Sequence, residues 1–162
     1  MRLLTIRRRP RPARSRGQSL AEFALVFPIL FLVVAAIIQF GLIFWAQNTL
    51  TQVARDTGRW AATQQNCDPS TATATVVSTA NAIAASSSLI GYTGGWTSPA
   101  NVEVAWTTES TLPPSTCPPT GNQQVAYVTI TLHQSVPMFF PFLPVSNALT
   151  TQAQFRMEPI SK

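Results

Sequence analysis

Residues 23–46 of the 162-residue chain read FALVFPILFLVVAAIIQFGLIFWA, and this stretch decides the fold. Of its 24 residues 21 are apolar, and the nearest charged residues are Glu22 before it and Arg55 after it. At a helical rise of about 1.5 Å per residue the stretch is about 36 Å long, enough to cross a hydrocarbon core of about 30 Å. A buried helix of a soluble protein would need a larger domain around it than this chain supplies. The stretch therefore predicts a transmembrane helix.

A secretory signal peptide also begins with positive charge and an apolar stretch. Its apolar region is usually about 7 to 15 residues long and ends in a cleavage site of small residues. The stretch here is longer and ends in the bulky Phe44 and Trp45. We therefore expect the helix to be retained as a membrane anchor.

Positive charge is concentrated before the helix. The first 16 residues hold seven arginines and no acid, whereas the rest of the chain holds four basic and six acidic residues, 4 − 6 = −2. The net charge of +5 thus belongs to one tail, so we expect no nucleic-acid partner. Only Arg55 and Arg59 follow closely on the other side, so the positive-inside rule places the N-terminus in the cytoplasm. The chain beyond residue 46 is then expected to be extracytoplasmic.

The junction between tail and helix reads RSRGQSLAEF over residues 14–23. A basic leader, Gly17 and a glutamate five residues further on resemble the processing site of type IV prepilins, where a membrane aspartyl peptidase cuts after the glycine. The resemblance implies cleavage between Gly17 and Gln18. Residues 1–17 would then be a leader, and Glu22 would be the fifth residue of the mature protein.

Cleavage would change the charge at the start of the helix. The new α-amino group of Gln18 is a cation at neutral pH. In a pilin-like assembly it would meet the Glu22 carboxylate of a neighbouring subunit, which would offset the cost of a carboxylate at the membrane and set the register between helices. The alternative is that Glu22 lies in the headgroup region near Arg16.

Residues 16–62 resemble the TadE family of minor pseudopilins from Tad (tight adherence, Flp-type) pilus systems. The matching features are Gly17-Gln18, Glu22-Phe23, Pro28, Phe40-Gly41 and the block ARDTGRWAA at 54–62. The chain departs from the family at Gln39, where an acid is common, and at Leu42, where arginine is common. The resemblance implies a structural subunit of the bacterial cytoplasmic (inner) membrane. Its partners would be a prepilin peptidase, other pseudopilins, pilus assembly-platform proteins and the lipid bilayer.

The helical pattern continues past the membrane to about residue 64. One i, i+4 row on this part consists of Ala46, Leu50, Ala54, Gly58 and Ala62. Small residues in such a row let another element approach closely. Two interpretations stay open: Ala54, Gly58 and Ala62 pack against another subunit's helix, or the row packs onto the protein's own domain.

The rest of the chain, residues 65–162, predicts a small α+β domain. Asp68-Pro69 is a favourable helix start, and 70–88 has apolar residues at helical spacing, although a low-complexity linker is the alternative. Apolar and polar residues alternate as in strands at 102–107, 127–133 and 149–157. The predicted fold class is α+β, with a long pilin-like helix over 18–64, its transmembrane part at 23–46, and a second helix and about three antiparallel strands packed on it.

Cys67 and Cys117 are about 50 residues apart. In an oxidising compartment they predict one disulfide, worth about 4 kcal/mol by the chain-entropy estimate, with free thiols as the alternative. No metal site is expected, because the two cysteines and His133 make only three candidate ligands without metal-type spacing.

The most apolar loop is residues 136–144, VPMFFPFLP, whose prolines forbid a regular helix. It predicts either a plug in the protein's own core or a surface for a partner pocket or the membrane.

The sequence contains none of the motifs G-x-S-x-G, H-E-x-x-H or a phosphate-binding glycine loop. We therefore expect a peptidase substrate rather than an enzyme, with His133 solvated and no cofactor. The favoured function is a minor pseudopilin of a Tad-type pilus assembly or secretion system that packs through its N-terminal helix. The alternative is an uncleaved single-pass anchor that displays a small extracytoplasmic binding domain.

Overall fold

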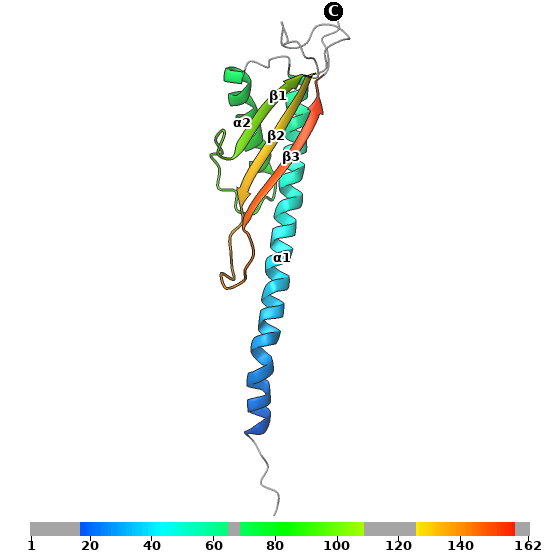
Figure 1. Cartoon of the computed structure of the whole chain (residues 1–162). Coiled ribbons are helices and arrows are strands. Elements are labelled where there is room, and N and C mark those ends of the chain that lie inside the picture. Colours follow the sequence, from blue (N-terminus) through cyan, green and yellow to red (C-terminus); the bar gives the residue numbers. More distant parts are fainter. Residues whose placement is uncertain (1–16, 65–68, 109–125, 158–162) are drawn as a thin grey trace, which may run out of the picture. The chain divides into compact units, whose positions relative to one another are not determined.

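The structure is a computed structural model that describes residues 17–64, 69–108 and 126–157. The elements are, in order, α1 (Gln18–Thr63), α2 (Pro69–Ser86), β1 (Val102–Thr108), β2 (Ala126–Ser135) and β3 (Ala148–Arg156) (Figure 1). A long N-terminal apolar helix, a second helix and three antiparallel strands confirm the predicted α+β fold class. Cys67 and Cys117, the predicted disulfide partners, and residues 1–16 of the predicted leader lie outside the described residues.

The chain divides into two compact units, residues 1–37 and 38–162, and the division falls inside α1. In the first unit α1 continues through Pro28. It exposes a nearly unbroken series of large apolar side chains from Leu20 to Val34. By length and composition α1 can cross a membrane, and only 11% of its most apolar window is buried. A core helix of a soluble domain would be covered, so the chain fits a single-pass membrane protein.

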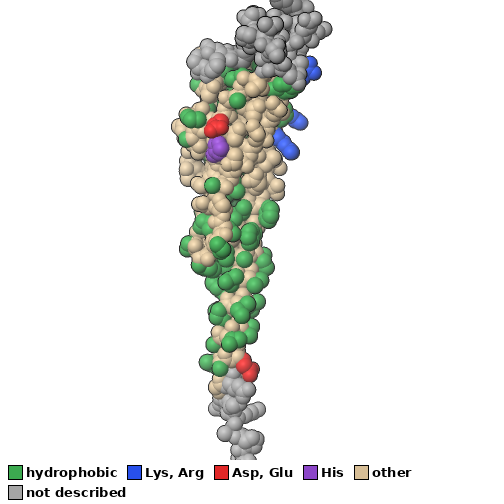
Figure 2. All heavy atoms as spheres, in the orientation of Figure 1, with side chains coloured by type: hydrophobic (Ala, Val, Ile, Leu, Met, Phe, Trp, Pro, Cys, Tyr) green, Lys and Arg blue, Asp and Glu red, His purple; other side chains and the backbone are tan. Residues whose placement is uncertain are grey.

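In the second unit the strands form one antiparallel sheet in the order β1-β2-β3. Ile130 in the central strand pairs with Val104 on one side and with Ala153 on the other. Because successive strand residues point to opposite faces, the predicted alternation gives the sheet one apolar face. The residues of that face buried in the core include Val102, Val128, Ile130, Leu132 and Leu149. Figure 2 shows hydrophobic side chains gathered mainly on α1, with other side-chain types covering much of the sheet.

The C-terminal half of α1 lies against this sheet. Thr51 Oγ1 is 3.3 Å from Thr151 Oγ1, and Gln47 Nε2 donates to the Thr150 carbonyl at 3.5 Å. Leu50 has no exposed surface and belongs to the same hydrophobic cluster as the sheet residues and α2. The core therefore joins α1, α2 and the sheet in one unit.

Asn81 of α2 ties down the segment that leads to β1. Its Nδ2 donates to the Trp96 carbonyl at 3.0 Å, and its Oδ1 accepts from the Trp96 N–H and the Tyr92 hydroxyl, each at 2.9 Å. The Trp96 indole N–H donates in turn to Gln134 Oε1 at 3.0 Å in the buried core. In the turn between Asn81 and Trp96, Gly91 has a φ of 83°, a conformation that glycine adopts without strain.

Candidate functional sites along the apolar helix

The predicted cleavage site lies where α1 begins. Gln18 is the first helical residue, and the Gly17 carbonyl accepts a hydrogen bond from the Ala21 N–H at 3.1 Å, which closes the first turn. Gly17 is exposed, and a Cβ added to it would meet no atom within 4 Å. Packing in the described chain therefore does not require a glycine here.

Glu22 lies on the surface of the same unit, one turn after Gly17. It is exposed, as are its neighbours Leu20 (72%) and Phe23 (63%). The carboxylate thus borders the apolar stretch directly. This placement agrees with both sequence interpretations, the pairing with a neighbouring subunit and the headgroup position.

The small-residue row of α1 faces the protein's own sheet. Ala46 and Ala54 have no exposed surface, and Ala62 is partly buried against the same core. A Cβ added to Gly58 would lie 2.5 Å from Cδ2 of Phe155 and 3.7 Å from Cγ1 of Ile130. The close approach that the row permits is therefore made by β2 and β3, as in the second interpretation of the sequence.

Gln39 makes the most consequential contact that the sequence analysis missed. This amide has no exposed surface although it lies inside the apolar stretch. Its Oε1 accepts from the Phe139 N–H at 3.1 Å, and its Nε2 lies 3.4 Å from the Pro137 carbonyl and 3.6 Å from Sδ of Met138. The side chain of Gln39 thus binds the backbone of the proline-rich loop on both sides of Met138.

The loop itself, residues 136–144, is divided between core and surface. Val136 (1% exposed) and Leu143 (8%) are buried, whereas Phe139 (61%) and Phe142 (56%) are exposed. Phe140 lies against Phe142, with ring centroids 5.8 Å apart. The loop therefore meets both sequence interpretations in part, because it plugs the core and also presents two aromatic side chains outward.

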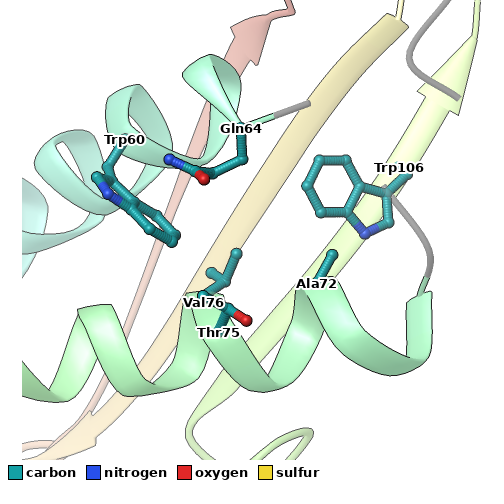
Figure 3. A pocket seen from close by; sticks show the side chains of 6 residues that line it. All are labelled: Trp60, Gln64, Ala72, Thr75, Val76 and Trp106. Carbon is teal, nitrogen blue, oxygen red and sulfur yellow. The ribbon is translucent and has the colours of Figure 1, made fainter. Parts of the chain in front are cut away.

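A small cavity of about 100 Å³ lies between the end of α1, the start of α2 and β1 (Figure 3). Trp60, Ala72, Val76 and Trp106 supply most of its wall. The indole N–H of Trp106 is buried and has no hydrogen-bond partner among the described residues. Gln64 and Thr75 complete the lining. None of these side chains is titratable, and no general base lies among them to activate the Thr75 hydroxyl, so we assign the cavity no chemistry.

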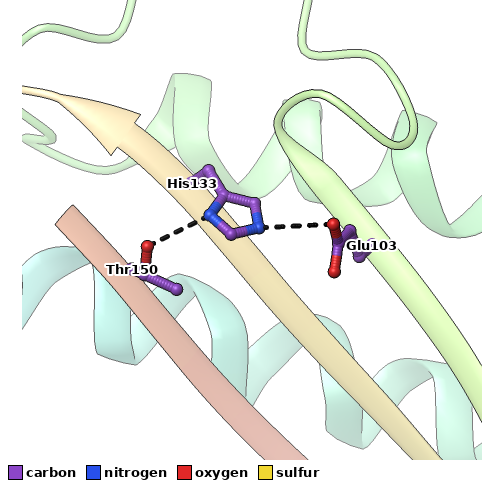
Figure 4. A network of polar contacts seen from close by, with 3 residues as sticks. All are labelled: Glu103, His133 and Thr150. Carbon is purple, nitrogen blue, oxygen red and sulfur yellow. Dashed lines mark hydrogen bonds and ion pairs between the residues drawn. The ribbon is translucent and has the colours of Figure 1, made fainter. Parts of the chain in front are cut away.

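His133 lies between its two neighbouring strands on the outward face of the sheet (Figure 4). Its Nδ1 is 3.1 Å from Oγ1 of Thr150, and its Nε2 is 3.7 Å from Oε1 of Glu103. The order carboxylate, imidazole and hydroxyl is that of a hydrolase triad. The His133 and Glu103 side chains are, however, 35% and 55% exposed, and water weakens such an interaction. We interpret the cluster as a contact that joins three strands.

Comparison with known proteins finds a family match for one part of the chain. Residues 17–59 match the family model described as TadE-like protein, 43 of the 162 residues. The match confirms the resemblance predicted from the sequence and includes Gly17, Glu22, Gln39 and Gly58. No curated protein and no solved structure matches the chain.

Proposed function

We propose that the chain is a minor pseudopilin of a Tad pilus system, and the match of residues 17–59 to the TadE-like family model supports this proposal. In this function a prepilin peptidase cuts between Gly17 and Gln18. The processed subunit then packs with other pseudopilins and with assembly-platform proteins through the exposed part of α1. The protein acts as a substrate of the peptidase and not as an enzyme.

The single observation that carries the proposal is the setting of Gly17. This glycine is exposed, borders the helix and has open space where a side chain would be. The fold of the described chain gives no reason for it, whereas a peptidase cleft that must hold the chain extended does. Because α1 starts at Gln18, cleavage there keeps every residue of the helix and removes only the Gly17 carbonyl that accepts from the Ala21 N–H.

The charges that cleavage creates suit packing between subunits. Gln18 and Glu22 are four residues apart, about 6 Å along the helix axis. A neighbouring helix shifted by about one turn would bring its carboxylate to the new α-ammonium group. Seven arginines precede Gly17, so by the positive-inside rule the uncut N-terminus lies in the cytoplasm. The sheet and α2 then lie on the opposite, extracytoplasmic side of the inner membrane.

Analysis of the N-terminus in cells with an active prepilin peptidase tests the cleavage step. We expect the intact mass of the membrane-extracted protein to lack residues 1–17, with Gln18 as the first residue. Gly17→Val should keep the leader, because its branched side chain does not fit an extended site made for glycine. Gly41→Val is the matched control, since Gly41 also has open space around it. Retention of residues 1–17 in the wild type would reject the proposal and leave an uncleaved anchor that displays its second unit.

A second experiment separates processing from assembly. Glu22→Ala should still be cleaved, but it should no longer co-purify with the other pilus components. Glu22→Asp keeps the charge and should retain part of the association. Undiminished co-purification of the Glu22→Ala protein, together with wild-type amounts of pili, would show that the carboxylate sets no register.

A further inference from the structure

The second unit has one uncharged apolar surface outside α1. Among the described residues, the strongly exposed large apolar side chains lie on α1 between Leu20 and Trp45, with two exceptions. Those two are Phe139 and Phe142, and both belong to residues 136–144. Outside α1, the rest of the described second unit has no such exposed side chain, so the loop is unlike the sheet and α2 surface around it.

The loop is held beside the apolar stretch of α1. Figure 1 shows the segment between β2 and β3 next to the helix, and Gln39 binds the loop backbone at Phe139 and Pro137. Gln39 precedes Ala46, the last residue of the apolar stretch, by seven positions, or about 10 Å along the helix. The exposed side chains of Phe40 (45%) and Phe44 (67%) occupy the same part of α1.

The composition of the loop suits an apolar surrounding. No Asp, Glu, Lys or Arg occurs from residue 134 to residue 155. Pro137, Pro141 and Pro144 lack an N–H group, which reduces the number of backbone donors that lipid would leave unsatisfied. Three further donors are satisfied inside the unit. The Val136 N–H donates to the Asn147 carbonyl at 2.8 Å, the Phe139 N–H to Gln39 Oε1 at 3.1 Å, and the Leu143 N–H to the Phe140 carbonyl at 3.1 Å. Irregular backbone at the edge of a bilayer needs this kind of internal pairing.

We propose that residues 136–144 form a membrane-inserting loop. The partner that the loop contacts is the lipid of the leaflet in which the apolar stretch of α1 ends. Phe139 and Phe142 enter the boundary between headgroups and acyl chains, where aromatic side chains are favoured, next to Phe40 and Phe44. The Gln39 amide holds the loop at this depth and is itself shielded from lipid by the loop.

This loop redefines which part of α1 crosses the membrane. Of the apolar stretch, residues 23–38 remain for the hydrocarbon core. At about 1.5 Å per residue these 16 residues span about 24 Å, shorter than the usual thickness of about 30 Å, a mismatch that local thinning of the bilayer accommodates. Residues 39–46 then lie at the interface together with the loop. The folded second unit is seated directly on the bilayer. The proposal depends on membrane insertion of α1 and not on a role in a pilus.

Photocrosslinking from the loop tests the proposal. The full chain is reconstituted into vesicles of phosphatidylethanolamine and phosphatidylglycerol with p-benzoylphenylalanine in place of Phe142, a change that keeps an aromatic side chain. Phe44→p-benzoylphenylalanine is the positive control on α1, and Gln152→p-benzoylphenylalanine is the control on the exposed face of β3. We expect phospholipid adducts by mass spectrometry at Phe142 and Phe44, and none at Gln152.

Two outcomes would overturn the proposal. The first is the absence of a lipid adduct at Phe142 while Phe44 gives one, which would place the loop in water. The second is an adduct with a protein chain in place of lipid when the Phe142 experiment is repeated in native membranes, which would assign the loop to a partner. Either result leaves the cleavage at Gly17 untouched, so failure here is distinguishable from failure of the pseudopilin proposal.

The role of Gln39 has its own test in the same vesicles. Gln39→Leu keeps a side chain of similar volume and removes both the hydrogen-bond donor and the acceptor of the amide. The probe at Phe142 should therefore lose its lipid adduct, while the probe at Phe44 keeps it. Gln47→Leu is the matched control, because it removes another contact from α1 to the second unit, the 3.5 Å one to the Thr150 carbonyl. An unchanged Phe142 adduct in the Gln39→Leu protein would overturn the tethering role of Gln39.

Discussion

Replacing Gly58 by alanine probes a close approach between α1 and the sheet. The new Cβ would lie 2.5 and 2.6 Å from two ring carbons of Phe155, whereas carbon atoms in contact are normally about 3.5 to 4.0 Å apart. The ring or the end of β3 must therefore move by about 1 Å, and overpacking of this kind costs about 1 to 3 kcal/mol. Alanine gains up to about 1 kcal/mol over glycine in a helix interior.

Gly41→Ala isolates the packing cost from the helix preference. A Cβ at Gly41 meets nothing within 4 Å, so this variant receives the propensity gain without the clash. The free energy of unfolding of Gly58→Ala should be lower than that of Gly41→Ala by about 1 to 3 kcal/mol. For a folded unit of about 100 residues this corresponds to a midpoint lower by at least about 4 °C.

The measurement is thermal unfolding in detergent micelles, followed through the combined fluorescence of the four tryptophans, of which Trp96 is buried in the core. Adding Phe155→Leu to Gly58→Ala should recover part of the loss, since the smaller side chain frees the space. A Gly58→Ala protein as stable as Gly41→Ala would refute the reasoning. If that variant instead lost co-purification with other pseudopilins at unchanged stability, the small-residue row would serve a neighbouring subunit.

Two further predictions concern the segment between α2 and β1. Asn81→Ala removes the partners of both backbone groups of Trp96 and should lower the free energy of unfolding by about 2 kcal/mol, measured by urea denaturation. Gly91→Ala should destabilise the protein more than Gly94→Ala: both have positive φ, but only at Gly91 would a Cβ collide with the Ser135 carbonyl. Equal unfolding midpoints for the two glycine variants would contradict that contact.

The features that the sequence predicted are those encoded locally. The helix from Gln18 and the three strands follow from apolar periodicities of 3.6 and 2, which act over a few residues. Even the face of each strand could be predicted, since Val102 and Ile130 alternate with polar neighbours and both are buried. Gly17 and Glu22 could be picked out because the processing pattern is a short local motif.

Contacts between distant segments could not be predicted in this way. Gln39 pairs with the backbone of Pro137 and Phe139, 98 and 100 positions away, and a backbone contact leaves no side-chain signal in the sequence. The small-residue row around Gly58 indicates that something approaches closely but not what it is. The structure shows that the approaching residue is Phe155 of β3, which the sequence alone does not indicate.

The covering of α1 by its own sheet limits how subunits can meet. From residue 46 onward the small-residue face is occupied, and the side chains still exposed on the helix are polar or charged, among them Gln52, Arg55, Asp56 and Arg59. A neighbouring helix that approaches this strip meets both signs of charge, and such contacts are screened by salt. In the proposed assembly, apolar helix packing between subunits would therefore be confined to the exposed apolar part of α1 that starts at Gln18, which is where the cleavage and the Glu22 carboxylate would set the register.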